Sequence, residues 1–179
     1  NEMSKIIKEY NVETQKIIKN KNLIKFLNPI LNKNIKKKIL FSCVVPTVYK
    51  KIYKFLKTRK YEVYEIKKLP LKKLIKIKIE KYSQLGSDRI ANAIGAYSLY
   101  KKNCLVIDFG TATTFDIVRN PGVYEGGVIA PGIKLSILNL NRFTASLPTF
   151  NLKANLKTFG RNTNDALNAG FLWGYQGLI

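Results

Sequence analysis

The sequence predicts an α/β protein, and two observations indicate this class. Three strand-like runs follow one another: an apolar run over 104–108, a β-branched run over 113–118 and a third run over 123–129. Segments with apolar residues at helical spacing precede and follow these strands. With 179 residues, 46% of them hydrophobic, the chain is long enough to bury a core as one domain or as two small lobes.

The N-terminal part of the chain is expected to begin with helices and to continue into a strand. Apolar residues at helical spacing predict two or three short basic amphipathic helices within 1–38, interrupted near Asn11 and Pro29. The apolar run over 39–45, closed by Pro46, predicts a buried strand.

The next segment continues the alternation of helix and strand. Thr47 is suited to cap a helix over 48–57, whose apolar residues lie on one face. Alternating residues predict a strand over 61–66, and we expect 69–79 to be a connection that ends in a strand.

A helix is predicted to begin after the turn at Gly86 and Ser87, because small and apolar residues follow at helical spacing. Asp88 and Arg89 then lie in its first turn. Asp88 is suited to stabilise the helix start through the helix dipole. Alternatively, Arg89 binds the carboxylate of a substrate there and Asp88 accepts a proton. The local pattern leaves both interpretations open.

A carboxylate and a cluster of hydroxyls mark the turn after the central apolar strand. The strand delivers Asp108 to its end, and Gly110 allows the backbone to approach a ligand closely. Thr111, Thr113 and Thr114 supply hydroxyl groups. This combination suits a cation and the phosphate oxygens that the cation neutralises.

The C-terminal part is predicted to contain two helices after the last strands. A turn at 120–122 separates the strands, and an amphipathic helix is expected over 133–143, followed by a loop over 144–148. Capping residues over 162–165 begin the last helix, which carries glycines that would let it lie close to another backbone: Gly170, Gly174 and Gly177.

Composition excludes several classes of protein. No apolar run is long enough to cross a membrane and the N-terminus does not resemble an export signal, so we expect a cytoplasmic protein that does not bind membranes. Cys43 and Cys104 are expected to be buried, reduced thiols. The absence of histidine excludes a Ser-His triad and a His-bound zinc site.

The net charge of +21 allows two interpretations. A positive field favours nucleic-acid binding because neutralising phosphates releases counterions. The lysines are, however, scattered through a chain that is also rich in Ile and Asn, and no nucleic-acid motif or aromatic-interleaved basic stripe stands out. We therefore expect nucleic acid not to be a partner, while the same field would attract ATP and a carboxylate substrate.

Taken together, six segments resemble the type III pantothenate kinases, which belong to the superfamily of sugar kinases, actin and Hsp70. They occur in the order found in that family and extend from Phe41 to the C-terminal part of the chain. The segments are FSCVVP (41–46), LGSDRIANAIGAY (85–97), VIDFGTATTFDIV (106–118), GGVIAPGIKLSILNL (126–140), TASLP (144–148) and GRNTNDALNAG (160–170).

The resemblance implies an actin-like, ribonuclease-H-like two-lobe ATPase fold that is incomplete at both ends. Residues 1–102 would be the remnant of the first lobe and residues 103–179 the start of the second. The implied reaction is the ATP-dependent phosphorylation of pantothenate to 4'-phosphopantothenate, the first step of coenzyme A biosynthesis. The family also implies a homodimer.

The pantothenate site implied by the resemblance lies at the predicted helix start. Asp88 matches the general base that takes the proton of the hydroxyl group. Gly86, Ser87 and Arg89 would hold pantothenate, and the guanidinium suits its carboxylate. Thr163 matches a threonine at the same site, although a helix cap explains it equally well.

The resemblance also implies where ATP and ions bind. Thr111 matches a threonine that contacts ATP, and Asp108 matches a ligand of a monovalent cation, potassium or ammonium. Magnesium is expected with ATP. Asp116 is a further candidate for a cation or magnesium role. Thr144 is a weaker candidate near the substrate and is equally well explained as a loop hydroxyl.

One departure from the family concerns the first phosphate loop. No D-x-G-N-T-N sequence is present, and neither are the final strands and helices of the family. We therefore expect the chain to be an incomplete kinase, inactive or nearly so by itself. Two other functions remain open: a non-catalytic transcription accessory factor that binds nucleic acid, and a kinase for another small molecule.

Overall fold

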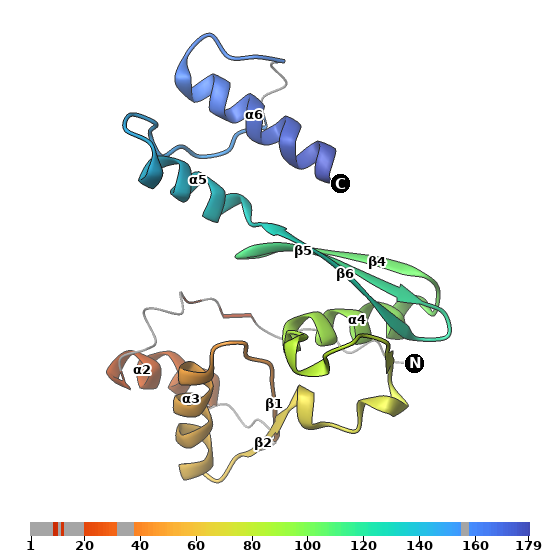
Figure 1. Ribbon diagram of the computed structural model, residues 1–179. Helices are drawn as coiled ribbons and strands as arrows, with labels where there is room; N and C mark the ends of the chain where they lie inside the picture. Colours follow the sequence, from red (N-terminus) through yellow and green to blue (C-terminus); the bar gives the residue numbers. More distant parts are fainter. Residues whose placement is uncertain (1–8, 11, 13–19, 32–37, 155–157) are drawn as a thin grey trace. The chain divides into compact units, whose positions relative to one another are not determined.

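The computed structural model describes residues 9–10, 12, 20–31, 38–154 and 158–179, and these residues confirm the mixed α/β class (Figure 1). The chain divides into two compact units, residues 1–76 with 80–95 and residues 77–79 with 96–179. The lobe boundary expected after residue 102 stays a prediction. Each unit is described by itself below.

The first unit combines helices with a small parallel sheet. Its main elements are α2 (Asn20–Leu31), β1 (Lys38–Phe41), α3 (Pro46–Thr58), β2 (Glu62–Glu65) and the start of α4 (Ser87–Tyr100). Strands β1 and β2 pair in parallel, with Lys38 opposite Glu62. Short 3-10 turns follow at Ile66–Lys68, Leu71–Lys73 and Tyr82–Gln84. The described helices, strands and turns of the unit bury these apolar side chains: Leu23, Val48, Leu56, Ile66, Leu71, Ile75, Leu85, Ile90 and Ala93.

The prediction of a buried strand over 39–45 is wrong in two respects. The strand β1 ends at Phe41, and residues 42–45 form a loop. Alternate residues of β1 are exposed, because successive side chains point to opposite faces of the sheet and one of these faces is open.

The helices before β1 are confirmed in part. Helix α2 continues through Pro29, which was expected to interrupt it, and ends at Leu31. A proline so close to the end removes a single hydrogen bond of the last turn, which the helix tolerates. The rest of the helices expected in this part, with the break near Asn11, lies outside the described residues.

The expected helix after the loop forms, but its start differs from the prediction. Helix α3 begins at Pro46, and its N-cap position is Val45, which makes no side-chain capping bond. Thr47 therefore lies inside the first turn and is not the cap, because the fixed φ of proline suits the first helical position. The strand expected over 61–66 is confirmed as β2. The connection expected over 69–79 ends in the short strand β3 (Lys76–Ile77), as predicted.

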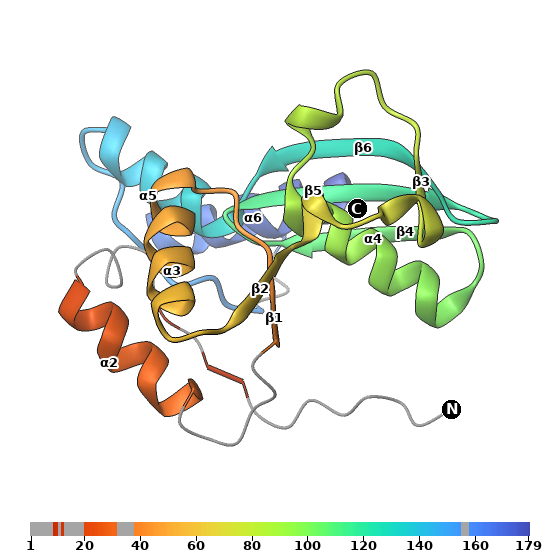
Figure 2. The same ribbon diagram turned by 90° about the horizontal axis from the view of Figure 1, so that it is seen from below.

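The second unit is built on an antiparallel sheet, and its strands confirm the predictions. The strands β4 (Cys104–Phe109), β5 (Ala112–Arg119) and β6 (Val123–Pro131) lie side by side in both ribbon views (Figures 1 and 2). The sheet order is β3-β6-β5-β4. Helices α5 (Ile133–Phe143) and α6 (Thr163–Leu178) follow, and α5 contacts β5.

A buried carboxylate lies at the centre of this sheet. Asp116 is fully buried, and the hydroxyl of Tyr124 donates a hydrogen bond of 2.7 Å to its Oδ1. The hydroxyl of Thr114 lies 3.4 Å from Oδ2. A buried charge is costly unless hydrogen bonds satisfy it, so these donors are required for the sheet to hold Asp116.

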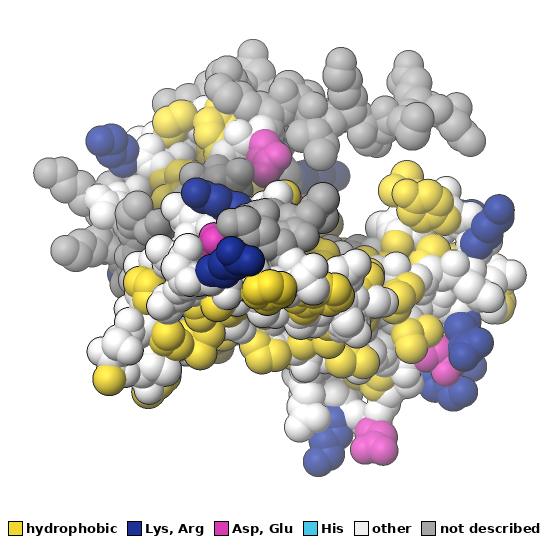
Figure 3. Space-filling view, turned by 90° about the horizontal axis from the view of Figure 1, so that it is seen from above, with side chains coloured by type: hydrophobic (Ala, Val, Ile, Leu, Met, Phe, Trp, Pro, Cys, Tyr) yellow, Lys and Arg dark blue, Asp and Glu magenta, His cyan; other side chains and the backbone are white. Residues whose placement is uncertain are grey.

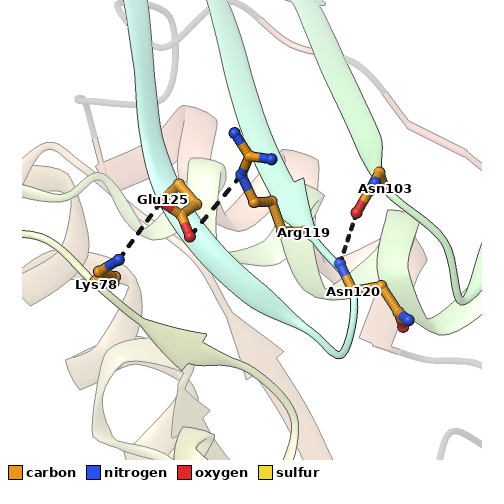
Figure 4. A network of polar contacts seen from close by, with 5 residues as sticks. All are labelled: Lys78, Asn103, Arg119, Asn120 and Glu125. Carbon is orange, nitrogen blue, oxygen red and sulfur yellow. Dashed lines mark hydrogen bonds and ion pairs between the residues drawn. The ribbon is translucent and has the colours of Figure 1, made fainter.

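Polar contacts link the ends of the strands that lie away from the β4–β5 turn (Figure 4). The carboxylate of Glu125 lies 3.9 Å from Nζ of Lys78 and 4.0 Å from Nε of Arg119. The side-chain oxygen of Asn103 accepts the backbone N–H of Asn120 at 2.9 Å. Because such exposed ion pairs stabilise a protein little, the amide contact between the ends of β4 and β5 is the firmer link.

Both cysteines are free, as expected, but neither is fully buried. Cys43 lies in the loop after β1 and Cys104 begins β4, and each is half-buried because it lies at the margin of its sheet. No helix among the described residues is long and apolar enough to span a membrane.

We expect Tyr124→Phe to lower the free energy of unfolding by about 2 kcal/mol, because the buried Asp116 carboxylate loses its shortest hydrogen bond. Denaturant unfolding measures this change. Tyr64→Phe is the matched control, since the hydroxyl of Tyr64 bonds Glu62 on the surface, and it should change stability by less than about 0.5 kcal/mol. Equal effects of the two substitutions would contradict the role assigned to Tyr124.

Candidate functional site

The first group of candidate residues lies at the start of α4. Ser87 is the first residue of the helix, and Asp88 and Arg89 occupy its first turn, as predicted. The backbone N–H of Arg89 donates to Oδ1 of Asp88 at 2.8 Å. Because the side chain of Asp88 is exposed, its carboxylate is accessible to a ligand as well as stabilising the helix start.

The loop after β1 is bonded to this helix start. The hydroxyl of Ser42 donates to the hydroxyl of Ser87 at 3.1 Å. Ser87 is only 2% exposed, whereas Ser42 is exposed. Ser87, which the resemblance places at the pantothenate site, is thus an inner hydroxyl, and Ser42 is the outer member of the pair. The sequence analysis assigned no role to Ser42.

Gly86 allows the carboxylate of Asp88 to lie over the turn. A Cβ atom on Gly86 would be 2.3 Å from Oδ1 of Asp88 and 3.7 Å from Cγ1 of Val44. A side chain at this position would therefore collide with the carboxylate. The role of Gly86 at the substrate site remains a prediction. Its lack of a side chain leaves room for the Asp88 carboxylate in the observed position.

The second group of candidates lies at the β4–β5 turn of the other unit. Asp108 is the next-to-last residue of β4 and is half-buried, directly opposite Thr114 of β5. The backbone N–H of Gly110 donates to the carbonyl of Ala112 at 3.0 Å, which closes the turn. Thr111 is exposed at its tip. The sequence therefore predicted this turn and its carboxylate correctly.

Asp108 and Asp116 lie on the same face of the sheet, because Thr114 is opposite Asp108 and two residues from Asp116. Asp116 is more deeply buried than Asp108, and its oxygens bond the hydroxyls of Thr114 and Tyr124. The more accessible carboxylate on this face is thus that of Asp108.

The turn is held in place by the entry to α5. Gly132 is buried, and a Cβ atom on it would be 2.2 Å from the carbonyl oxygen of Thr111 and 2.5 Å from that of Gly110. No residue with a side chain fits there without moving this backbone. The sequence pattern predicts the helix over 133–143 but gives no sign of this contact.

A large pocket of about 960 Å³ adjoins the β4–β5 turn. The turn contributes Phe109, Gly110 and Thr111, the start of α5 contributes Lys134, and the segment 149–152 closes the far side. The lining combines apolar surface with hydroxyl, backbone and ammonium groups, which suits a flat apolar ligand that carries negative charge. Two residues of this lining were candidates from the sequence: Thr111, and Gly110 as the residue that allows a close approach of the backbone to a ligand.

A second pocket, of about 520 Å³, lies between α5 and α6 and is lined mainly by apolar side chains. Thr163 lines it, together with Ser136 and Tyr175. The hydroxyl of Tyr175 donates to the carbonyl of Pro131 at 2.8 Å and lies 3.1 Å from the hydroxyl of Ser136. This tyrosine thereby links α6 to the entry of α5.

The structure also shows the positions of the two remaining threonine candidates, Thr163 and Thr144, relative to the helix ends. The cap of α6 is Asn162, whose side chain accepts the backbone N–H of Asp165 at 2.9 Å, so Thr163 is the first helical residue and not the cap. Thr144 is exposed and donates to the carbonyl of Leu140, which agrees with its interpretation as a loop hydroxyl. Neither described pocket is lined by Thr144.

Within each unit the structure thus brings together only part of the candidate set. Gly86, Ser87, Asp88 and Arg89 are neighbours in the first unit. Asp108 and Thr111 share one turn of the second unit, while Thr163 lines the separate pocket beside α6. No group of three or more acidic, Cys or His side chains that could hold a metal occurs among the described residues.

Comparisons with known proteins agree on one family. The profile of the type III pantothenate kinases matches residues 2–179. The chain is 50% identical over 151 residues to the type III pantothenate kinase of Pelagibacter ubique (strain HTCC1062), covering 83% of this chain and 58% of that protein. It is 48% identical over 97 residues to that of Koribacter versatilis (strain Ellin345), covering 54% and 35%. The chain thus spans little more than half the length of these relatives, or less.

The fold is also similar to that of a solved structure. It is the crystal structure of a protein from Campylobacter jejuni described as a conserved candidate transcriptional activator of the Baf family. The TM-score is 0.56 at 25% sequence identity, and the match covers 86% of this chain and 67% of the other.

We expect Gly132→Ala to displace the β4–β5 turn, because the added methyl group overlaps two backbone oxygens. The free energy of unfolding should fall by about 2 kcal/mol or more, and the amide signals of Gly110 and Thr111 should shift in NMR spectra. Gly95→Ala is the control: nothing lies within 4 Å of the added atom in helix α4, and alanine should stabilise the helix by about 0.5–1 kcal/mol. Unchanged Gly110 and Thr111 signals in Gly132→Ala would contradict the contact.

Proposed function

Because the chain belongs to the type III pantothenate kinase family, we propose that the protein transfers the γ-phosphoryl group of ATP to the primary hydroxyl of pantothenate. The product is 4'-phosphopantothenate, and the reaction is the first step of coenzyme A biosynthesis, carried out in the cytoplasm. The observation that carries the proposal is the exposed carboxylate of Asp88 beside Arg89 at the start of α4, in a chain of this family.

The role we assign to Asp88 is that of a general base. Its carboxylate takes the proton of the pantothenate hydroxyl as that oxygen forms a bond to the γ-phosphorus, and the bond from phosphorus to the β-phosphate oxygen breaks to release ADP. Arg89 binds the carboxylate of pantothenate, for which its planar guanidinium is suited. Gly86 leaves room for the Asp88 carboxylate, and Ser87 supports the substrate site from inside the turn.

The pocket beside the β4–β5 turn is the proposed nucleotide site. Its apolar lining, including Phe109 and Phe150, suits the base of ATP, and Lys134 and Thr111 suit the phosphates. Gly132 supports this function by holding the turn in place. Thr163 remains a proposed contact of pantothenate, and its freedom from a capping role leaves the hydroxyl available to a ligand.

The donors at the end of β4 fit a hard cation. The carboxylate of Asp108 and the hydroxyl of Thr114 present oxygen atoms on one face, and such atoms are the preferred ligands of potassium and magnesium. We propose that Asp108 holds the monovalent cation, potassium or ammonium, which would neutralise charge on the transferred phosphate; magnesium would enter with ATP. The Asp116 carboxylate is buried under two hydroxyl donors, so we assign it to the support of Thr114 and not to the cation.

We further propose that the protein works as a homodimer. A Cβ atom on Gly170, Gly174 or Gly177 of α6 would meet none of the described residues beyond the adjoining turns of its own helix within 4 Å. Trp173 and Phe143 are 56% and 76% exposed. Hydrophobic side chains also form patches on the surface seen in Figure 3. An open helix face with exposed aromatic side chains nearby suits packing against a second copy.

The alternative is a nucleic-acid-binding accessory factor on the same fold. The Campylobacter jejuni protein described as a candidate transcriptional activator and the net charge of +21 favour it. It predicts salt-sensitive DNA binding that does not depend on Asp88. The third option is a kinase for another substrate. Measuring turnover on a panel of small hydroxylated acids distinguishes it from a pantothenate kinase.

In the full-length protein, Asp88→Asn should lower kcat at least 100-fold while the affinity for pantothenate changes little, because the amide keeps the shape of the side chain but cannot take the proton. Steady-state kinetics and calorimetric binding measure the two quantities. Glu80→Gln, an exposed carboxylate outside the site, is the matched control and should behave as the unsubstituted protein. Full activity of Asp88→Asn would refute the role of Asp88, and a lack of pantothenate turnover in the unsubstituted protein would refute the proposed function.

Asp108→Asn should weaken activation by potassium, because the amide removes the negative charge that binds the ion. We expect the potassium concentration for half-maximal activity to rise at least 10-fold, as measured by titrating the salt at constant ionic strength. Glu125→Gln, on the same sheet but in the surface ion pairs, should leave this concentration unchanged. An unaltered potassium response in Asp108→Asn would move the cation site elsewhere.

A further inference from the structure

We propose that Val44, in the loop between β1 and α3, is a specificity-determining residue that contacts the paired methyl groups of pantothenate. The inference rests on the proposed function and assigns a role to a residue outside the implied substrate set. It concerns only residues of the first unit.

Contacts at both ends restrict the path of the loop over 42–45. Pro46 begins α3 and restricts the residue before it, and Val45 has an extended backbone with φ −107° and ψ 103°. The carbonyl of Val45 accepts the backbone N–H of Tyr49 at 3.0 Å, and Ser42 bonds Ser87 at 3.1 Å. The loop is therefore tied to α3 at one end and to the start of α4 at the other, so the position of Val44 between these ties is restricted.

Val44 lies close to the proposed base. The position of a Cβ atom on Gly86 is 3.7 Å from Cγ1 of Val44 and 2.3 Å from Oδ1 of Asp88. The methyl group and the carboxylate oxygen are consequently at most about 6 Å apart. Val44 is 60% exposed, so a ligand that reaches Asp88 meets an accessible apolar group beside it.

The chemistry of pantothenate matches this pair. The carbon that bears its primary hydroxyl is bonded to a quaternary carbon with two methyl groups. When the hydroxyl lies within hydrogen-bond distance of Asp88, roughly 2.7 Å, both methyl carbons are three bonds away from the hydroxyl oxygen. The Val44 methyl group, which is at most about 6 Å from the carboxylate oxygen, can then contact these methyl groups at roughly 4 Å, the usual contact distance between apolar atoms.

An exposed valine alone carries no function, because single apolar side chains are common on protein surfaces. Val44 differs from such residues in its short distance to Asp88 and in the two ties that hold its loop. A contact with one or two methyl groups discriminates between substrates by roughly 10-fold or more, which kinetics can resolve.

The test compares two substrates in the full-length protein. One is pantothenate, and the other is its analogue without the paired methyl groups. Val44→Thr keeps the shape of the side chain and replaces one methyl by a hydroxyl group. We expect kcat/KM for pantothenate to fall about 10-fold, while kcat/KM for the analogue changes less than about 2-fold, so that the preference for pantothenate is reduced.

Val128→Thr is the matched control, since Val128 is a similarly exposed valine, 55%, on strand β6. It should leave the preference unchanged, and thermal unfolding of both variants should match that of the unsubstituted protein. An equal loss for both substrates, or no loss for either, overturns the inference alone. If the unsubstituted protein does not phosphorylate pantothenate, the proposed function and the inference fail together.

Discussion

The burial of one carboxylate constrains the second unit more than any other interaction. Asp116 has no exposed surface, and a charge in such a place destabilises a fold unless donors surround it. Tyr124 provides one donor from β6, which requires β5 and β6 to keep their register, and Thr114 provides the other from β5 itself, two residues from Asp116. In the neighbouring β4–β5 pair, Thr114 lies opposite Asp108, so the residue that supports the buried carboxylate also adjoins the proposed cation site.

A second constraint is the close packing at two glycines, against backbone at Gly132 and against a side chain at Gly86. Gly132 brings the entry of α5 against the carbonyls of Gly110 and Thr111, and Gly86 leaves space for the carboxylate of Asp88. Both glycines adjoin residues with proposed roles in phosphoryl transfer. Since catalysis of this reaction depends mainly on positioning and on neutralising charge, small shifts at these contacts would matter more for activity than for the fold.

The sequence predicted those elements whose pattern is local. Helix α5, the strands β4 to β6 and the first turn of α4 all follow from periodicity, turn residues and small residues at fixed offsets. The predictions of a buried strand over 39–45 and of Thr47 as a cap were wrong, because neighbouring structure decides strand burial and Pro46 determines where α3 begins.

The parts of the site that the sequence could not predict depend on contacts between distant residues. The bond between Ser42 and Ser87 joins residues 45 positions apart, and nothing in either local segment signals it. The contact of Gly132 with the β4–β5 turn and the pocket beside it likewise arise only when the sheet and α5 pack. Motifs therefore identified the charged residues, whereas packing revealed the residues that hold them.

These supporting contacts differ in kind from the charges they support. A carboxylate such as that of Asp88 cannot be replaced by an amide without loss of its role, because an amide cannot accept the proton that the proposed reaction releases. By contrast, shape and hydrogen bonding are what Ser42, Val44 and Gly86 contribute, so substitutions at these residues would alter the site by degrees. If the proposed function holds, the reaction type therefore depends on the first turn of α4, whereas the loop after β1 is where the choice of substrate can be altered without loss of the base.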